Sequence, residues 1–257
     1  MHKELLFAFV AFFLMSLNVV VGANTFEIQQ QTGEIVIESW QKDVTGDGHK
    51  NVITLYGTPY DEDSPYFQKV WSIVQTKDGQ KLRMDYDSGY NPTLQFVDLN
   101  HDQVLDVFYS SATGGNGGIY HYAAHSTKSE TVEDLAVPDP LTIVGKFKQD
   151  YQAVVTFKET GKSYQINLMD RKKNYDLLNL YENGTLVKPT RLMIAPFTSL
   201  EVVNIDNETG KGLKGTQLIS GAYHADSIGV AQSEWYFEKG KWKLKKMNWS
   251  PLQASTR

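Results

Sequence analysis

The sequence contains no cysteine, which excludes disulfide bonds, zinc–thiolate sites, thiol catalysis and lipid attachment through a cysteine. Basic residues are also in short supply, because 25 lysines and arginines against 30 acidic residues give a net charge of -5. Nucleic acid is therefore not an expected partner, since its phosphates require a concentrated basic face. Hydrophobic residues at 41% and aromatic residues at 12%, with only eight prolines, indicate a packed globular chain.

Residues 1–23 have the layout of a secretory signal peptide. Lys3 supplies a positive charge, a long apolar run follows, and small residues precede a cleavage point after Ala23. The alternative is a retained membrane anchor, but the apolar run is short for a span and two polar residues interrupt it. We therefore expect an exported mature chain, residues 24–257, that has no membrane association after cleavage.

From residue 25 onward, short β-branched and aromatic runs alternate with Gly, Asn and Asp turn signals. Runs of this kind are typical of an all-β protein. Helical periodicity is scarce, with one candidate helix around residues 170–181. Trp235, Trp242 and Trp249 resemble a sugar-stacking surface, but in a protein of repeated sheets they are expected to belong to the core.

Two acidic segments repeat at a fixed offset. Residues 43–51 lead into Val-Ile-Thr-Leu-Tyr, and residues 98–106, which begin 55 residues later, lead into Val-Phe-Tyr-Ser. A fainter copy begins at Asn204, about twice that offset further on, which leaves room for a unit without a loop at 141–189. We predict one β-repeat domain over 24–257: an all-β, β-propeller-like repeat of about four small antiparallel sheets, closed or incomplete. The competing interpretation is coincidence between turn-rich strands.

The first two acidic segments alternate oxygen-bearing residues in the way that a calcium-binding loop requires. The predicted ligands are Asp43, Thr45, Asp47, the carbonyl of His49 and Asn51 in the first loop, and Asp98, Asn100, Asp102, the carbonyl of Val104 and Asp106 in the second. We predict one or two Ca²⁺ ions. Gln103 stands where the sharp turn favours glycine, so it must accept a left-handed backbone. The alternative is a pair of Asx-rich turns without metal, and the loop at Asn204 is expected to be such a metal-free turn.

The paired motifs Asp-x-Thr-Gly-Asp-Gly-x-x-Asn-Val-Ile (43–53) and Asp-x-Asn-x-Asp-x-x-x-Asp-Val-Phe (98–108) resemble the FG-GAP/VCBS repeats of integrin α-subunits and bacterial surface proteins. The resemblance implies β-propeller blades with calcium held by Asp/Asn loops between adjacent strands. The glycine-rich stretch 113–118 also looks like small exported or spore-coat-associated proteins of spore-forming bacteria. Both resemblances point to a protein outside the cytoplasm.

These observations favour a binding or structural protein over an enzyme. We expect a secreted, monomeric, calcium-stabilised protein of the cell surface or spore coat, with a surface protein or a polysaccharide as its partner. The alternative is a secreted hydrolase of cell-wall or polysaccharide substrates that uses Asp61, Asp63 or His224. His121 and His125 would share one face of a helix as zinc ligands, but their surroundings are typical of a strand, so zinc is not expected there.

Overall fold

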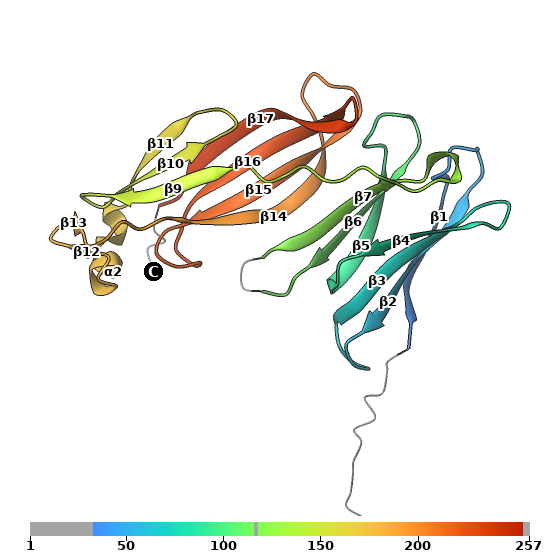
Figure 1. Cartoon of the computed structure of the whole chain (residues 1–257), viewed down its shortest axis with the longest axis horizontal. Helices are drawn as coiled ribbons and strands as arrows, with labels where there is room; N and C mark the ends of the chain where they lie inside the picture. Colours follow the sequence, from blue (N-terminus) through green and yellow to red (C-terminus); the bar gives the residue numbers. More distant parts are fainter. Residues whose placement is uncertain (1–32, 116–117, 254–257) are drawn as a thin grey trace, which may run out of the picture. The chain divides into compact units, whose positions relative to one another are not determined.

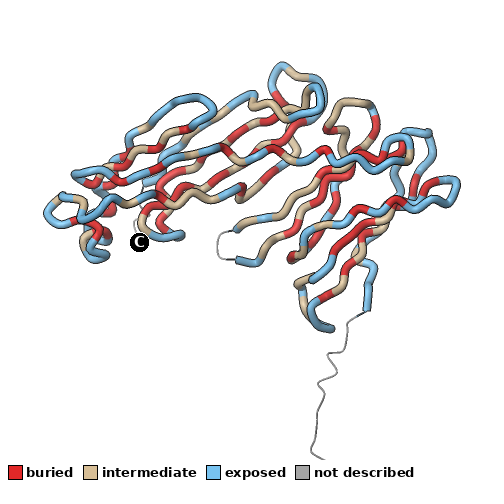
Figure 2. The backbone as a smooth tube through the Cα atoms, viewed as in Figure 1, coloured by how far each residue is buried: buried red, intermediate tan, exposed pale blue. Residues whose placement is uncertain are grey.

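Alternation of buried and exposed side chains accounts for the strands. In β2 (Asn51–Pro59), Ile53 and Leu55 are completely buried, whereas Val52 is 42% exposed. Such a period of two places one face of a sheet against a core. The computed structural model describes residues 33–115 and 118–253, and Figure 2 shows this alternation along many strands. The predicted signal peptide lies outside the described residues.

An eight-stranded antiparallel sheet comes first in the described chain. Its strands are β1 (Ile35–Lys42), β2, β3 (Tyr66–Gln75), β4 (Lys81–Tyr86), β5 (Gly89–Val97), β6 (Asp106–Ala112), β7 (Tyr120–Ser126) and β8 (Glu133–Asp134). Each strand pairs with the next one along the chain, except that β5 pairs with β3 through only two residue pairs, Tyr66 with Tyr90 and Phe67 with Gly89. The sheet therefore consists of two meanders, β1–β4 and β5–β8, with the same strand order (Figure 1).

Three smaller antiparallel sheets follow. The first contains β9 (Ile143–Lys148), β10 (Gln152–Phe157) and β11 (Ser163–Asn167), and the second contains β12 (Tyr181–Glu182) and β13 (Thr185–Leu186). The last is a third four-stranded meander of β14 (Met193–Asn204), β15 (Lys211–Ser220), β16 (Ser227–Glu238) and β17 (Lys241–Pro251). Short helical turns complete the described elements: η1 (Lys128–Glu130), η2 (Met169–Arg171) and α2 (Lys172–Leu177). The candidate helix is thus confirmed in a shorter form.

A buried ion pair anchors η2 and α2 to the last sheet. Arg171 Nε donates to Asp226 Oδ1 at 3.0 Å, and the Tyr175 hydroxyl donates to Asp226 Oδ2 at 2.6 Å. Arg171 also donates to the carbonyl oxygens of Ser227 and Leu252, each at 3.0 Å. Both charged residues of the pair are less than 10% exposed (5% and 7%), so their mutual hydrogen bonds replace the water that each loses.

Three clusters of buried hydrophobic residues form the core. One lies between the first two meanders and includes Leu55 and Val107. A second joins the second meander to the last sheet, since it contains Phe108 and Leu213. The third fills the C-terminal sheets. The first two clusters bring together residues that are far apart in the sequence. They therefore hold the strands that carry the acidic loops and the pocket in place.

The tryptophans near the C-terminus belong to these cores, as predicted. Trp235 is 9% exposed within the third cluster. Trp242 and Trp249 are partly buried and pack against the same cluster. Tyr236 points the other way and stacks on His101, with the two ring centroids 4.2 Å apart. The aromatic side chains of this hairpin are therefore used mainly for packing.

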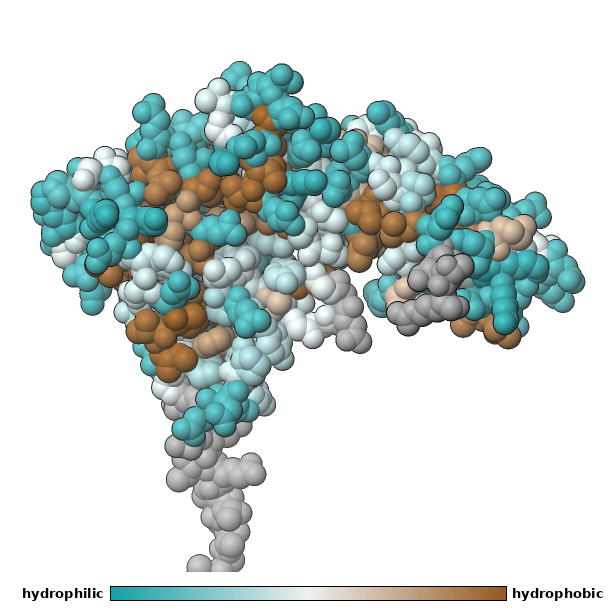
Figure 3. Space-filling view, turned by 180° about the vertical axis from the view of Figure 1, so that it is seen from behind, coloured by the Kyte–Doolittle hydropathy of each residue, from teal (hydrophilic) through white to brown (hydrophobic). Residues whose placement is uncertain are grey.

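Exposed hydrophobic side chains form separate patches on the face seen in Figure 3. Over the described chain as a whole, the large exposed hydrophobic residues include Val36 of β1, Val144 of β9 and Leu177 of α2. Within the described residues, none of the helical segments is both long and apolar enough to cross a membrane.

The all-β class and the presence of four antiparallel sheets are confirmed. The sheets are unequal, with eight, three, two and four strands, because the first two meanders are continuous through β3 and β5. The strands β1–β4, β5–β8 and β14–β17 each form a four-stranded meander. Their propeller-like arrangement stays a prediction.

Candidate functional site

The two acidic loops occupy equivalent hairpins. Residues 43–50 connect β1 to β2, and residues 98–105 connect β5 to β6, with Lys42 opposite Asn51 and Val97 opposite Asp106. Gly46 and Gly48 have φ of +76° and +82°, while their counterparts His101 and Gln103 have +65° and +70°. Gln103 therefore does adopt the left-handed backbone predicted for it, which costs about 1–2 kcal/mol in a residue with a Cβ atom.

The first carboxylate of each loop accepts hydrogen bonds from backbone N–H groups later in the same loop. Asp43 accepts backbone hydrogen bonds from Gly46 at 2.8 Å and Gly48 at 2.9 Å, one on each carboxylate oxygen. Asp98 likewise accepts from the backbone N–H groups of Asp102 at 3.1 Å and Gln103 at 2.9 Å. A carboxylate has about four lone-pair sites, so each oxygen keeps acceptor capacity after these bonds.

The last residue of each motif is buried at the base of its loop. Asn51 Oδ1 accepts from the Val44 backbone N–H at 3.0 Å, and Asp106 Oδ2 accepts from those of Leu99 at 2.8 Å and Asn100 at 3.2 Å. Asp106 is completely buried, and its Oδ1 has no hydrogen-bond partner within the described residues. Burial, opposed by the two backbone hydrogen bonds and by the nearby Ser126 hydroxyl and reinforced by the Asp102 charge, raises the pKa of Asp106 to about 6. This lone buried oxygen is the feature that fits a cation.

The remaining predicted ligands are only partly gathered. In the first loop, the hydroxyl of Thr45 donates to Asn51 at 3.3 Å, and Asp47 accepts from the His49 backbone N–H at 2.8 Å, which lowers the pKa of Asp47. The His49 ring also faces Asp47, with 3.5 Å between its Nδ1 and a carboxylate oxygen. The Asp47 carboxylate is therefore paired with His49 within the loop. The predicted calcium ligand from His49 is its backbone carbonyl, not its ring.

In the second loop, the amine of Lys128 contacts one of the predicted ligands, Asp102. Lys128 Nζ lies 3.0 Å from the Asp102 carbonyl oxygen and 3.3 Å from its carboxylate. Asn100 donates to the same carboxylate at 3.2 Å. The Val104 side chain packs against Gly46 of the first loop. A Cβ atom at position 46 would lie only 2.6 Å from it. No cluster of three or more histidine and acidic side chains arranged for a metal occurs in residues 33–115 and 118–253, so the calcium prediction depends on loop conformation and on Asp106.

The loop at Asn204 differs in length and in partners. It connects β14 to β15, whose ladder closes with Asn204 opposite Lys211. Lys246 Nζ lies 3.2 Å from an Asp206 oxygen, and Lys245 Nζ lies 2.7 Å from a Glu208 oxygen. Both carboxylates in this loop are thus neutralised by lysines.

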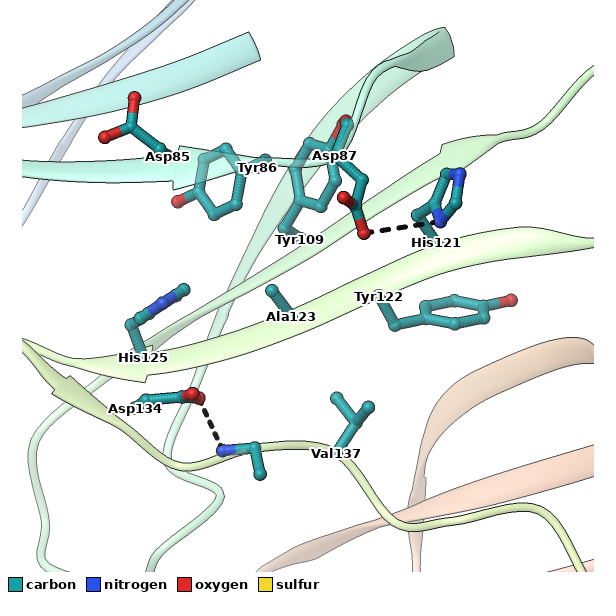
Figure 4. A pocket seen from close by; sticks show the side chains of 11 residues that line it. Asp85, Tyr86, Asp87, Tyr109, His121, Tyr122, Ala123, His125, Asp134 and Val137 are labelled. Atoms are coloured by element: carbon teal, nitrogen blue, oxygen red, sulfur yellow. Dashed lines mark hydrogen bonds and ion pairs between the residues drawn. The ribbon is translucent and has the colours of Figure 1, made fainter. Parts of the chain in front are cut away.

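A pocket of about 590 Å³ opens in the second meander and its junction with the first. Its walls come from the end of β4, from β6 and β7, and from β8 with the segment after it (Figure 4). The lining residues are Asp85, Tyr86, Asp87, Tyr109, His121, Tyr122, Ala123, His125, Asp134, Ala136 and Val137. Carboxylates, imidazoles and phenols therefore share one cavity.

Two stacked tyrosines support one wall of the pocket. The rings of Tyr86 and Tyr109 are nearly parallel with centroids 4.1 Å apart. The Tyr109 hydroxyl donates to the backbone carbonyl of Asp87 at 2.7 Å, and burial raises the pKa of Tyr109 to about 12. The Tyr86 hydroxyl lies 2.7 Å from Ser72 Oγ, and burial raises its pKa as well. Both phenols stay uncharged at neutral pH.

A histidine stands beside an aspartate at each end of the pocket. His121 Nδ1 lies 3.4 Å from a carboxylate oxygen of Asp87. His125 is paired with Asp134 in the ladder between β7 and β8, and its Nδ1 has no hydrogen-bond partner within the described part of the chain. Burial lowers the pKa of His125, so this imidazole is neutral at pH 7.

The two pocket histidines were set aside at the sequence level because they were tested only as a helical pair. On strand β7, side chains alternate between faces, so His121, Ala123 and His125 point to the same side. A strand period of two was the signal available to find them. Asp61, Asp63 and His224, proposed for a hydrolase, are exposed and none of them lines the pocket.

Residues 141–250 match the family model described as "YybI C-terminal domain", a segment that covers β9 to nearly the end of β17. The chain is 28% identical over 213 residues to "Uncharacterized protein YybI" of Bacillus subtilis (strain 168), with 80% of each chain covered. The predicted FG-GAP/VCBS identity is wrong, because the matching family model is that of the YybI domain and no FG-GAP/VCBS model matches. The alternating Asp/Asn loops that suggested it are local features of hairpins, which unrelated families can share.

Similar solved structures include the exotype rhamnogalacturonan lyase YesX, with a TM-score of 0.36, 17% identity and coverage of 84% of this chain. The rhamnogalacturonan lyase YesW has a TM-score of 0.35, 18% identity and coverage of 87% of this chain. The chain matches about a third of the length of these lyases, 33% and 35% respectively.

Proposed function

We propose that this protein is an exported, calcium-stabilised binding or structural protein of the cell surface or of a spore layer. The observation that supports the calcium part is the buried Asp106 Oδ1, for which the described residues provide no hydrogen-bond partner within bonding distance. It lies at the base of a loop that has the left-handed turns of its glycine-containing counterpart. A buried ionised oxygen is stable only when a proton, a donor or a cation satisfies it.

The second loop has the better set of oxygens for Ca²⁺. Asp98, Asn100, Asp102, the carbonyl of Val104 and Asp106 would hold the ion there, with three carboxylates among them. The first loop offers two carboxylates, Asp43 and Asp47, together with Thr45, the His49 carbonyl and Asn51, so its affinity is expected to be lower. Bound calcium would stabilise the folded chain because it binds the loop only when the hairpin is formed.

Calorimetric titration of Ca²⁺ into the mature protein tests this role. Asp98→Asn should abolish the tighter binding event, whereas Asp61→Asn, which changes an exposed residue outside both loops, should leave it intact. Absence of any saturable heat in the wild type, with Mg²⁺ as a parallel titrant, would remove calcium from the proposal.

The export and location depend on the N-terminal leader and are tested separately. A tagged copy carrying residues 1–23 should be recovered outside the cytoplasm, in the envelope or in the spore layers, and a copy without them should stay inside. The propeller-like arrangement is supported by the three four-stranded meanders. An experimental structure that shows how the meanders are arranged would decide it.

A further inference from the structure

We propose that the pocket between β4 and β8 binds a hydroxyl-rich saccharide that is either uncharged or carries an amino group. This inference gives a ligand class to the binding role proposed above, and it does not depend on calcium. It starts from the size of the pocket, about 590 Å³, which lies within the range of small-molecule sites.

The charge of the pocket selects against anions. Of its three carboxylates, Asp85 is neutralised by Arg83, whose side chain donates to it at 2.6 Å and 2.9 Å. Asp87 and Asp134 remain, and among the described residues the cationic group within ion-pair distance of Asp87 is the His121 ring. A uronic acid or a phosphate would therefore be repelled, whereas hydroxyl and ammonium donors match carboxylates that can only accept hydrogen bonds.

The two aspartates keep acceptor capacity toward the ligand. Asp87 has a side chain that is 74% exposed, and its one ion-pair partner on the pocket wall is at 3.4 Å. Asp134 uses Oδ1 to accept from the Ala136 backbone N–H at 2.7 Å. Figure 4 shows these aspartates on opposite walls, one on the β4–β5 side and one on β8. Two acceptors placed apart suit a ligand with several hydroxyl groups.

Polar and aromatic groups lie between the two aspartates. His125 contributes to the wall by packing edge-on against Tyr86, with ring centroids 5.8 Å apart, and its buried Nδ1 is not offered to a ligand. Tyr122 borders the pocket through its place on β7, but its ring stacks on Phe108 on the other face of the sheet, and its hydroxyl accepts from the Leu200 backbone N–H at 2.9 Å. The aromatic rings on the pocket side are those of the stacked pair Tyr86 and Tyr109. Aromatic rings near carboxylate acceptors combine apolar and polar surface, and a sugar ring presents the same combination.

Calorimetric or NMR titrations with three probes test the proposal: a glucosamine tetramer, an N-acetylglucosamine tetramer and a galacturonate trimer. We expect saturable binding of one or both of the first two and none of the galacturonate. Asp87→Asn and Asp134→Asn should each weaken binding about tenfold or more, since a hydrogen bond to a charged group is lost. Asp61→Asn is the matched control on an exposed loop and should bind as the wild type does.

Circular dichroism and thermal melts of each variant show that it is folded, so that lost binding is not lost structure. Preference for galacturonate, no saturable binding of either amino sugar, or equal affinities in the wild type and both pocket variants would overturn the proposal. The calcium titration reports separately on the loops. Sugar binding without a calcium response would contradict only the calcium role, and the reverse would contradict only the pocket.

Discussion

Replacing Asp106 with asparagine should stabilise the calcium-free protein at neutral pH. The hairpin already shows that asparagine fits this position, because Asn51 occupies the equivalent place in the first loop and accepts the equivalent backbone hydrogen bond. Asp106→Asn keeps the accepting oxygen and removes the charge of a completely buried carboxylate. In excess calcium the wild type should instead be the more stable protein, since the Asp106→Asn variant loses one of the three carboxylates of the second loop.

The size of the effect follows from the pKa of Asp106, which burial raises from 3.8 to about 6. Each unit corresponds to about 1.4 kcal/mol, so the cost of ionising Asp106 in the folded state is about 3 kcal/mol. Below pH 3.8 the group is protonated in the folded and unfolded chains and the cost is absent. Between pH 3.8 and about 6 the unfolded chain ionises Asp106 while the folded chain keeps it protonated, so the free energy of unfolding falls over this window and levels off above it.

Urea unfolding in EGTA at several pH values between 4 and 7 measures this directly. The difference in free energy of unfolding, Asp106→Asn minus wild type, should increase by about 3 kcal/mol over that range. Taking the difference cancels the other carboxylates, including Asp47 and Asp176, whose lowered pKa values act in the opposite direction. A difference that stays constant with pH would refute the reasoning, because it would mean that Asp106 is not held in a costly buried state.

Two further substitutions test contacts elsewhere. Asp226→Asn should lower the free energy of unfolding by about 1.5–3 kcal/mol, because Arg171 and the Tyr175 hydroxyl lose a charged acceptor while Asp170 still pairs with Arg171; chemical denaturation measures it, and a loss below about 1 kcal/mol would show that the pair is dispensable. Lys128→Met should lower the melting temperature in EGTA and tighten calcium binding, because the amine that neutralises Asp102 is gone. Unchanged calcium affinity in calorimetry would contradict a competition between the amine and the ion.

The features predictable from the sequence were local ones. Short β-branched and aromatic runs between turn residues, such as 51–56, predicted the strands, and the spacing of Asp98 to Asp106 predicted a loop between strands with a left-handed backbone at Gln103. These depend on neighbouring residues and on the period of a strand, so they can be read without knowing the tertiary fold.

The features that could not be predicted depend on contacts between distant segments. The pocket requires β4, β6, β7 and β8 to meet, and that follows from the β3–β5 pairing that joins the two meanders. Lys128 reaches Asp102 across 26 residues, and Arg171 reaches Asp226 across 55. The family resemblance failed for the related reason that short acidic hairpin loops carry little information about the sheets around them.

The thermal melting temperature in EGTA and in millimolar calcium tests the central claim most directly. With calcium at about a hundred times its dissociation constant, the folded state should gain about 2.7 kcal/mol, which corresponds to a rise of roughly 5–10 °C for a chain of this size. Asp98→Asn should show little or no rise. An equal melting temperature in both conditions for the wild type would contradict a calcium-stabilised fold.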